Sequence, residues 1–294
     1  MTEGLLVSTL IYGLVNSAVL LLTSLGFSLT FGLSGVANFA HGGLYLLSGF
    51  LCWLLVHGAG IPFPLAALAT IVLVGLLGAA IYRVVLMPVR GIVLSEVIST
   101  FAVGVAMIEF FRWKGFTTYD YSLPVFVEGS FEVLGVSVDW HRLVIVAVAL
   151  ALTGLLWLFT HRTMVGLALR GMSQDEYTAL SVGIESDWAA MLSLGLGSAL
   201  AAVAGIALLP LGIISINIGY DVLLIALAVT VLGGMESTVG LILGSVLVGF
   251  AMVITGNYLG PRWSEVVYLF AIVLMLAVKP SGLLGKSKEL EDRV

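Results

Sequence analysis

The chain has 294 residues, of which 60% are hydrophobic and only 10% are charged, with a mean hydropathy of +1.17. A soluble domain carries about 25% charged residues, so this composition cannot cover an aqueous surface and excludes a large soluble domain. The net charge of −5 says little about partners, and nothing in the sequence favours nucleic acid.

Apolar stretches long enough to cross a lipid bilayer recur along the whole chain. A helix of about 20 apolar residues crosses a hydrocarbon core of about 30 Å. Nine candidates lie at about residues 5–32, 42–57, 64–87, 92–112, 141–160, 188–211, 221–235, 239–257 and 263–279. The stretches at 42–57 and 221–235 are short, which predicts half-helices or re-entrant segments. The expected fold is all-α and polytopic, a single transmembrane domain over residues 1–294 with about eight or nine helices.

Two residue types and the start of the chain add further expectations. The 35 glycines predict close helix contacts and several broken helices, since small residues let membrane helices approach. Cys52 is the single cysteine, which excludes a disulfide within the chain. The N-terminal sequence lacks the basic start and cleavage site of a signal peptide, so we expect the first span to be retained.

The distribution of basic residues predicts the orientation of the chain, because Lys and Arg are enriched in cytoplasmic loops. With nine spans, the loops on one side hold Arg83, Arg90, Arg162, Arg170, Lys279, Lys286, Lys288 and Arg293, and those on the other hold Arg112, Lys114, Arg142 and Arg262. We therefore expect a cytoplasmic C-terminus and an external N-terminus. The loop at about 113–140, which includes Asp120, is then external, and its stretch FEVLGVSV predicts a small strand.

A polar interruption follows the first span. In GVANFAHGG, Gly35 to Gly43, the side chains of Asn38 and His41 are three residues apart and would share one face of a helix. The surrounding glycines predict a broken helix, whose freed backbone groups can bind a solute. The alternative is a helix turn at the cytoplasmic interface, with Asn38 and His41 facing lipid headgroups.

Acidic residues within the spans have structural and functional interpretations. Glu96 and Glu109 lie in the fourth span and Asp221 opens the seventh, where we expect interface residues and a helix N-cap. An ion-coupled secondary transporter or channel would instead use these carboxylates to carry protons or ions. The chain has no HExxH, GxSxG or Walker A motif and no Cys and His cluster, so we expect neither an enzyme, a metal site nor a bound cofactor.

The longest polar stretch between spans, at about 161–187, predicts a short cytoplasmic helix. We expect this helix at about 173–182, with Ser173 as N-cap, Asp175 and Glu176 in the first turn, and Gly183 as its stop. Ala179 and Leu180 would give it a small apolar face. A helix of this kind can dock on a partner ATPase, although an ordinary amphipathic connector has the same pattern.

Several stretches in this order resemble one family. Arg170-Gly171, Asp175, Ala179 and Gly183-Ile184 resemble the coupling loop of ABC-importer permeases, specifically the branched-chain (hydrophobic) amino-acid uptake family. Further matching stretches are GLSGVANFAHGGLYLLSGF at 32–50, YRVVLMPVRG at 82–91, VLGGMESTVGLILGSVLVG at 231–249 and KPSGLLGK at 279–286. ANFAHG is typical of the shorter of the two permease types in that family.

This resemblance implies a permease subunit of a bacterial inner-membrane importer. Its solute would be a branched-chain or hydrophobic amino acid, or a related small polar solute such as urea, a short amide or a carboxylate. The implied partners are a second related permease, two cytoplasmic ATPase subunits that bind the ATP, and an external solute-binding protein.

Two sets of site residues follow, the first for coupling to the ATPase and the second along the translocation path. The coupling set is Arg170, Gly171, Ser173, Asp175, Glu176, Ala179, Gly183 and Ile184. The path set is Asn38, Ala40, His41 and Gly42, to which we add Asp221. Gly171 departs from the usual family pattern, and Asp221 and the external loop lie outside it, which leaves the solute open.

Overall fold

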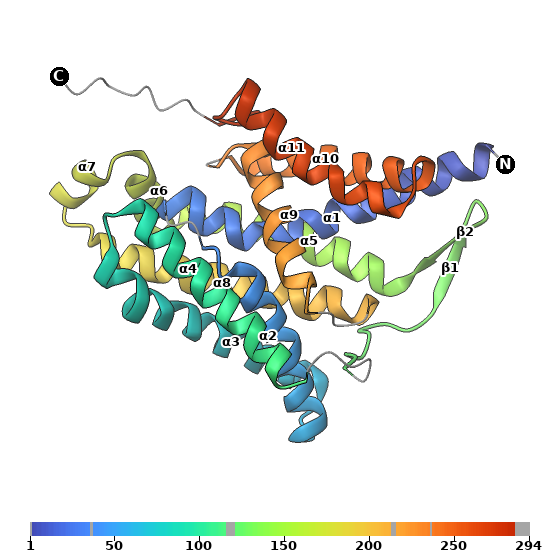
Figure 1. Ribbon diagram of the computed structural model, residues 1–294, viewed down its shortest axis with the longest axis horizontal. Helices are drawn as coiled ribbons and strands as arrows, with labels where there is room; N and C mark the ends of the chain where they lie inside the picture. The colour runs from blue at the N-terminus through green and yellow to red at the C-terminus, as the bar shows by residue number, and fades with distance from the viewer. Residues whose placement is uncertain (1, 36–37, 116–120, 213–215, 236, 286–294) are drawn as a thin grey trace.

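The structure, a computed structural model, describes residues 2–35, 38–115, 121–212, 216–235 and 237–285 (Figure 1). Four charged residues used for the orientation argument, Asp120, Lys286, Lys288 and Arg293, lie outside these ranges. The α-helices are α1 Thr2–Ser34, α2 His41–Trp53, α3 Phe63–Ile81, α4 Val93–Trp113, α5 Trp140–Arg162, α6 Met164–Gln174, α7 Glu176–Ser181, α8 Ser186–Leu208, α9 Ile218–Gly233, α10 Thr238–Tyr258 and α11 Pro261–Val278. Short π and 3-10 segments are η1 Leu54–Gly58, η2 Tyr82–Leu86, η3 Met87–Val89 and η4 Leu209–Leu211.

The nine apolar stretches all become helical. Within the described residues, seven helical segments are long and apolar enough to cross a membrane, and α9 is a shorter apolar helix of 16 residues. The stretch expected at 42–57 is the 13-residue α2 extended by η1. The prediction of an all-α polytopic membrane protein with two short segments is therefore confirmed.

Small residues line the helix contacts at the centre of the bundle. α8 is the most buried span, and its buried face is mostly Ala, Gly and Ser. These residues allow close approach: a Cβ added at Gly26 of α1 would overlap the carbonyl oxygen of Gly197 of α8. Helices α4, α5 and α11 lie at the periphery and expose Leu, Val and Phe side chains, as expected for surfaces that face lipid.

The two ends of the bundle differ. Strands β1 Ser130–Val133 and β2 Val136–Asp139 form an antiparallel hairpin at the end where the N-terminus lies (Figure 1). Leu134 and Gly135 both have positive φ, 51° and 80°, which is the two-residue turn that suits a hairpin. The stretch FEVLGVSV, predicted as one small strand, thus forms nearly the whole hairpin, with parts of both strands and the turn between them. Helices α6 and α7 lie at the opposite end, together with the end of α11.

Candidate functional site

The polar segment between α5 and α8 contains two helices rather than one. α6 ends at Gln174, Asp175 is extended with φ −154° and ψ 107°, and α7 begins at Glu176. Asp175 caps α7, because its Oδ1 accepts the backbone N–H of Thr178 at 3.3 Å and its Oδ2 accepts the Thr178 hydroxyl at 2.6 Å. The expectation that Ser173 is the N-cap was wrong. Ser173 lies inside α6, where its hydroxyl donates to the Arg170 carbonyl oxygen at 2.9 Å.

The end of α7 follows the predicted pattern. Gly183 has φ +87°, and the N–H of Ile184 donates to the carbonyl oxygen of Ala179 at 3.1 Å, which closes the helix as a glycine stop does. Ala179 is buried against the rest of the chain, whereas Leu180 and Val182 are exposed. The apolar surface available to a partner is therefore Leu180 and Val182, and the side chain of Glu176 is outside what the structure describes.

An ion pair connects the segment between α5 and α8 to the end of the third span, which precedes α4. Arg90, after η3, pairs with Asp187 in the first turn of α8, four residues after Gly183 in the chain. The buried Tyr82 joins this contact: its hydroxyl donates to Asp187 Oδ1 at 2.7 Å and accepts from Arg90 Nη1 at 2.7 Å. Sequence analysis assigned none of these three residues to the site, although YRVVLMPVRG was among the stretches that match the family.

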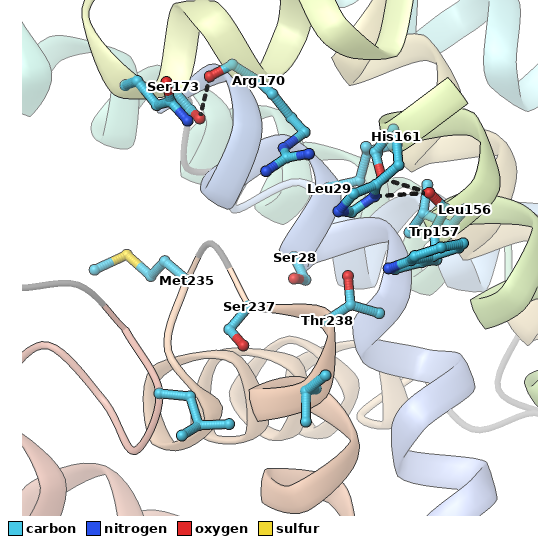
Figure 2. A pocket seen from close by; sticks show the side chains of 14 residues that line it. Ser28, Leu29, Leu156, Trp157, His161, Arg170, Ser173, Met235, Ser237 and Thr238 are labelled. Atoms are coloured by element: carbon cyan, nitrogen blue, oxygen red, sulfur yellow. Dashed lines mark hydrogen bonds between the residues drawn. The ribbon is translucent and has the colours of Figure 1, made fainter. Parts of the chain in front are cut away.

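Two of the predicted coupling residues lie against a cavity inside the chain (Figure 2). This inner cavity has a volume of about 280 Å³. Its lining residues come from α1, α5, α6, the α9–α10 turn, the start of α10 and the segment after α11: Ser28, Leu29, Leu156, Trp157, Thr160, His161, Arg170, Ser173, Gln174, Met235, Ser237, Thr238, Val239 and Leu284. The Arg170 guanidinium extends into the inner cavity toward α5 and α1. Arg170 and Ser173 thus face inward, away from the exposed side chains of α7.

The ANFAHG stretch forms the break between α1 and α2. Gly35 has φ +68° just after α1 ends, and α2 begins at His41, which confirms the predicted break. Asn38 Oδ1 accepts the N–H of Ala40 at 3.1 Å, and His41 Nε2 lies 2.9 Å from the carbonyl oxygen of Thr23 in α1. Both polar side chains are buried. Among the described residues, Asn38 Nδ2 and His41 Nδ1 have no hydrogen-bond partner.

The rest of this break packs tightly on two other helices. A Cβ added at Gly42 would overlap the carbonyl oxygen of Gly219 at the start of α9. On the other side, a Cβ at Gly104 of α4 would lie 3.0 Å from the Cα of Ala40. The space beside Gly42 and Gly219 is about 10 Å³, room for one water at most. In this conformation the four ANFAHG residues of the path set are packing residues and line no wide channel through the described residues.

The carboxylates of the spans have ordinary partners. Asp221 lies inside the first turn of α9, three residues after its start, so the expected N-cap role was wrong. Its Oδ1 accepts the hydroxyl of Tyr268 at 3.4 Å. Glu96 accepts the N–H of Gly91 at 2.9 Å, and Glu109 pairs with Arg112 at 3.2 Å. Asp221 follows Gly219, which packs against Gly42 of the ANFAHG break, by two residues, but it does not itself line the space beside Gly42.

A second cavity, at the end of the bundle that carries the hairpin, was missed by sequence analysis. It has a volume of about 480 Å³ and lies between α1, α10, α11 and the start of α5. Its polar lining includes Asn16, whose amide donates to the Gly249 carbonyl oxygen at 3.2 Å, and Asn257, whose amide donates to the Thr9 hydroxyl at 3.1 Å. The signal that could have found it was an asparagine inside each of two apolar stretches.

The comparisons with known proteins agree with this architecture. A family model described as "Branched-chain amino acid transport system / permease component" matches residues 9–278. The chain is similar to the high-affinity branched-chain amino acid transport system permease protein BraD of Pseudomonas aeruginosa, at 29% identity over 94% of this chain and 95% of the relative. It is 28% identical to the corresponding protein LivH of Escherichia coli K12, over 93% of this chain and 94% of that one.

One solved structure has a related fold. PsaBC from Streptococcus pneumoniae, determined in complex with Fab, superposes with a TM-score of 0.52 over 96% of this chain and 97% of that chain. The sequence identity is 15%, so this likeness concerns the fold alone. The overall arrangement of the helices is therefore one that a solved structure also has.

Proposed function

Because the chain belongs to the branched-chain amino acid permease family, we propose that it is the transmembrane subunit of an ATP-driven importer. The proposed solute is a branched-chain or hydrophobic amino acid, or a related small polar solute such as urea, a short amide or a carboxylate. The chain itself would have no enzymatic activity and no cofactor, and ATP would be bound by separate subunits. The names and the near full-length coverage of BraD and LivH support this assignment.

The observation that carries the mechanical part of the proposal is α7. It is a short helix between two spans, capped by Asp175, stopped at Gly183 and exposing Leu180, with the exposed Val182 directly after its last residue. A helix that presents a small apolar face outside the bilayer fits a groove on a partner protein. The proposed partners are two cytoplasmic ATPase subunits, a second related permease and an external solute-binding protein.

Coupling would run from α7 into the bundle. Movement of α7 on ATP binding would act on α8 through the segment at Gly183 and on the end of the third span through Asp187 and Arg90. α8 packs directly on α1, α2 and α3, so a shift of α8 would reach the ANFAHG break. The unpaired Asn38 Nδ2 and His41 Nδ1 support a second conformation in which these atoms bind solute or water.

The proposed orientation in a bacterial inner membrane places α6 and α7 in the cytoplasm and the N-terminus and hairpin outside. It is supported by the basic residues near the α6 end, Arg83, Arg90, Arg162, Arg170 and Lys279. The hairpin lies at the other end of the bundle, where a solute-binding protein would dock (Figure 1).

Reconstitution in lipid vesicles tests the function. The chain, its second permease and the ATPase should take up radiolabelled leucine only with ATP and the solute-binding protein. Vesicles that hold the permeases alone should show no uptake under a proton or sodium gradient. Uptake driven by such a gradient would replace the proposal with the ion-coupled transporter, in which Glu96, Glu109 or Asp221 would be the coupling groups.

A further inference from the structure

The inner cavity contains a cation that the coupling proposal does not use. Arg170 is half-buried, and its guanidinium makes no hydrogen bond or ion pair with any residue that the structure describes. A guanidinium withdrawn from water is unfavourable unless an anion or several acceptors face it. Its planar fork of N–H donors suits a carboxylate, which it can bind through two parallel hydrogen bonds.

Hydroxyl donors face this cation across the inner cavity. Ser28 of α1 and Thr238 at the start of α10 lie on this space, and the neighbouring Ser237 also lines it (Figure 2). Ser237 Oγ accepts the N–H of Gly240 at 3.0 Å, which leaves its hydroxyl hydrogen free to donate to a ligand. Thr238 and Val239 are the first two residues of the 21-residue α10, whose N-terminal end carries partial positive charge.

The remaining wall of the inner cavity has an apolar part beside the polar side chains of Thr160, His161, Ser173 and Gln174. Leu29, Leu156 and Trp157 lie on the α1 and α5 side, and Met235, Val239 and Leu284 lie on the α10 side. A volume of about 280 Å³ is near the lower limit of the range of roughly 300–1,000 Å³ for small-molecule sites. The space therefore suits a small molecule with one anionic end and a short apolar tail.

We propose that the inner cavity binds a small carboxylate with an apolar tail, and that Arg170 holds the carboxylate. The carboxylate follows from the cavity itself, whereas its identification as the imported amino acid on the cytoplasmic side rests on the proposed function. Arg170 belongs to α6, which leads directly into α7. A bound carboxylate would tie α6 to α1 and α10 and favour this arrangement of the coupling segment.

Tryptophan fluorescence of the purified full-length chain tests the binding directly. Trp157 lines the inner cavity and stacks on His161 with ring centroids 4.7 Å apart, so a ligand there should change its emission. The probes are 4-methylpentanoate, L-leucine and L-leucinamide, which share a similar tail. The first two should give a saturable change that the Trp157→Phe variant lacks. Leucinamide, which has no carboxylate, should give none.

Two variants of Arg170 distinguish binding in the inner cavity from a general effect of positive charge. Arg170→Gln should weaken binding of 4-methylpentanoate at least tenfold, and Arg170→Lys should weaken it less because the positive charge remains. Arg162→Gln is the matched control, since Arg162 is exposed at the end of α5 and is not among the lining residues. It should bind as the wild type does. Thermal unfolding of each variant shows that the fold is retained.

The outcomes decide whether the inner cavity binds a carboxylate and which kind of molecule carries it. Equal binding by Arg170→Gln, or equal binding of leucinamide, would overturn the proposal. Emission that responds to phosphatidylglycerol in place of phosphatidylcholine nanodiscs, with no response to either carboxylate, would assign the cavity to a lipid headgroup instead. If 4-methylpentanoate binds and L-leucine does not, the carboxylate site is supported, but the imported amino acid is excluded as its ligand. None of these measurements uses the ATPase, so a failure here leaves the transport proposal standing.

Discussion

Arg90 and Asp187 form an ion pair that connects the end of the third span to the first turn of α8, although they are 97 residues apart in the chain. The pair is asymmetric, since the Arg90 side chain is 20% exposed and the Asp187 side chain is 51% exposed. The buried Tyr82 hydroxyl contacts both partners. The contact therefore has a buried side that fixes its geometry and a solvated side next to the coupling segment.

We predict that Arg90→Gln and Asp187→Asn reduce uptake more than they reduce stability. A partly exposed pair contributes only about 0.2–1 kcal/mol, because solvent screens it. Uptake per ATP hydrolysed should fall several-fold, since α8 would no longer move together with the third span. Thermal unfolding and reconstituted uptake, in a double-mutant cycle, measure the two effects separately.

The control for this prediction is Arg112→Gln, which breaks the exposed pair with Glu109 at the other end of α4. It should leave both stability and uptake near the wild-type values. If Arg90→Gln showed wild-type coupling between hydrolysis and uptake, the ion pair would have no part in transmission.

We predict that Leu180→Glu with Val182→Glu prevents ATPase docking while the permease stays folded. Their side chains are 46% and 73% exposed, so charge there costs little folding free energy but is unfavourable in an apolar groove. Co-purification of the ATPase should drop at least tenfold at unchanged melting temperature. Leu134→Ser, at the exposed hairpin tip on the opposite end, is the matched control and should retain the ATPase.

This choice of positions differs from what the sequence suggested. The sequence placed Ala179 on the small apolar face of the coupling helix, but Ala179 is only 4% exposed, so Ala179→Trp would disturb the packing of α7 itself. Reversing the charge of Asp175 would remove the helix cap at a cost of about 0.5–2 kcal/mol. A loss of docking in either variant would therefore not distinguish a folding defect from a lost contact with the ATPase.

The sequence predicted the spans well because their signal is local. Length and hydropathy decide whether a helix can cross the bilayer, and the two segments expected to be short are α2 and α9. The stop at Gly183 was also predictable, since a glycine after a helical pattern favours positive φ.

What the sequence missed depends on contacts between distant segments. Ser173 and Asp175 are both good N-cap residues, and only the packing of α6 on α1, α5 and α8 decides that α6 continues through Ser173. The inward direction of Arg170 has the same origin, because α6 turns that face toward the α9–α10 turn. The Tyr82, Arg90 and Asp187 contact joins segments about 100 residues apart, which no local pattern reports.

We predict that Gly42→Ala is strongly destabilising and that Gly154→Ala is not. A methyl group at Gly42 would overlap the backbone of Gly219, and backbone cannot move aside without shifting α9. Overpacking of this kind typically costs about 1–3 kcal/mol. Gly154, on the exposed face of α5, has no atom within 4 Å of an added Cβ, so alanine there should be neutral or stabilising by up to about 1 kcal/mol. Thermal unfolding of both variants in one detergent makes the comparison, and equal melting temperatures would contradict the tight crossing of α2 and α9.

We predict that His41→Leu and His41→Gln separate the structural and transport roles of this side chain. His41 Nε2 contacts the Thr23 carbonyl oxygen at 2.9 Å, and a glutamine amide can replace that nitrogen as a donor. Leucine cannot, so His41→Leu should lose about 0.5–1.5 kcal/mol of stability, whereas His41→Gln should melt close to the wild type.

Uptake gives the second half of that test. His41 Nδ1 is buried without a partner among the described residues, and an unpaired buried nitrogen is retained at a cost in stability. Glutamine has no atom in the place of Nδ1, so His41→Gln should fold normally but lose most of its ATP-driven uptake. Full uptake by the stable His41→Gln variant would mean that His41 acts only through its contact with Thr23, which holds α2 against α1. Reduced uptake at normal stability would instead make Nδ1 the atom that the second conformation of the cycle uses.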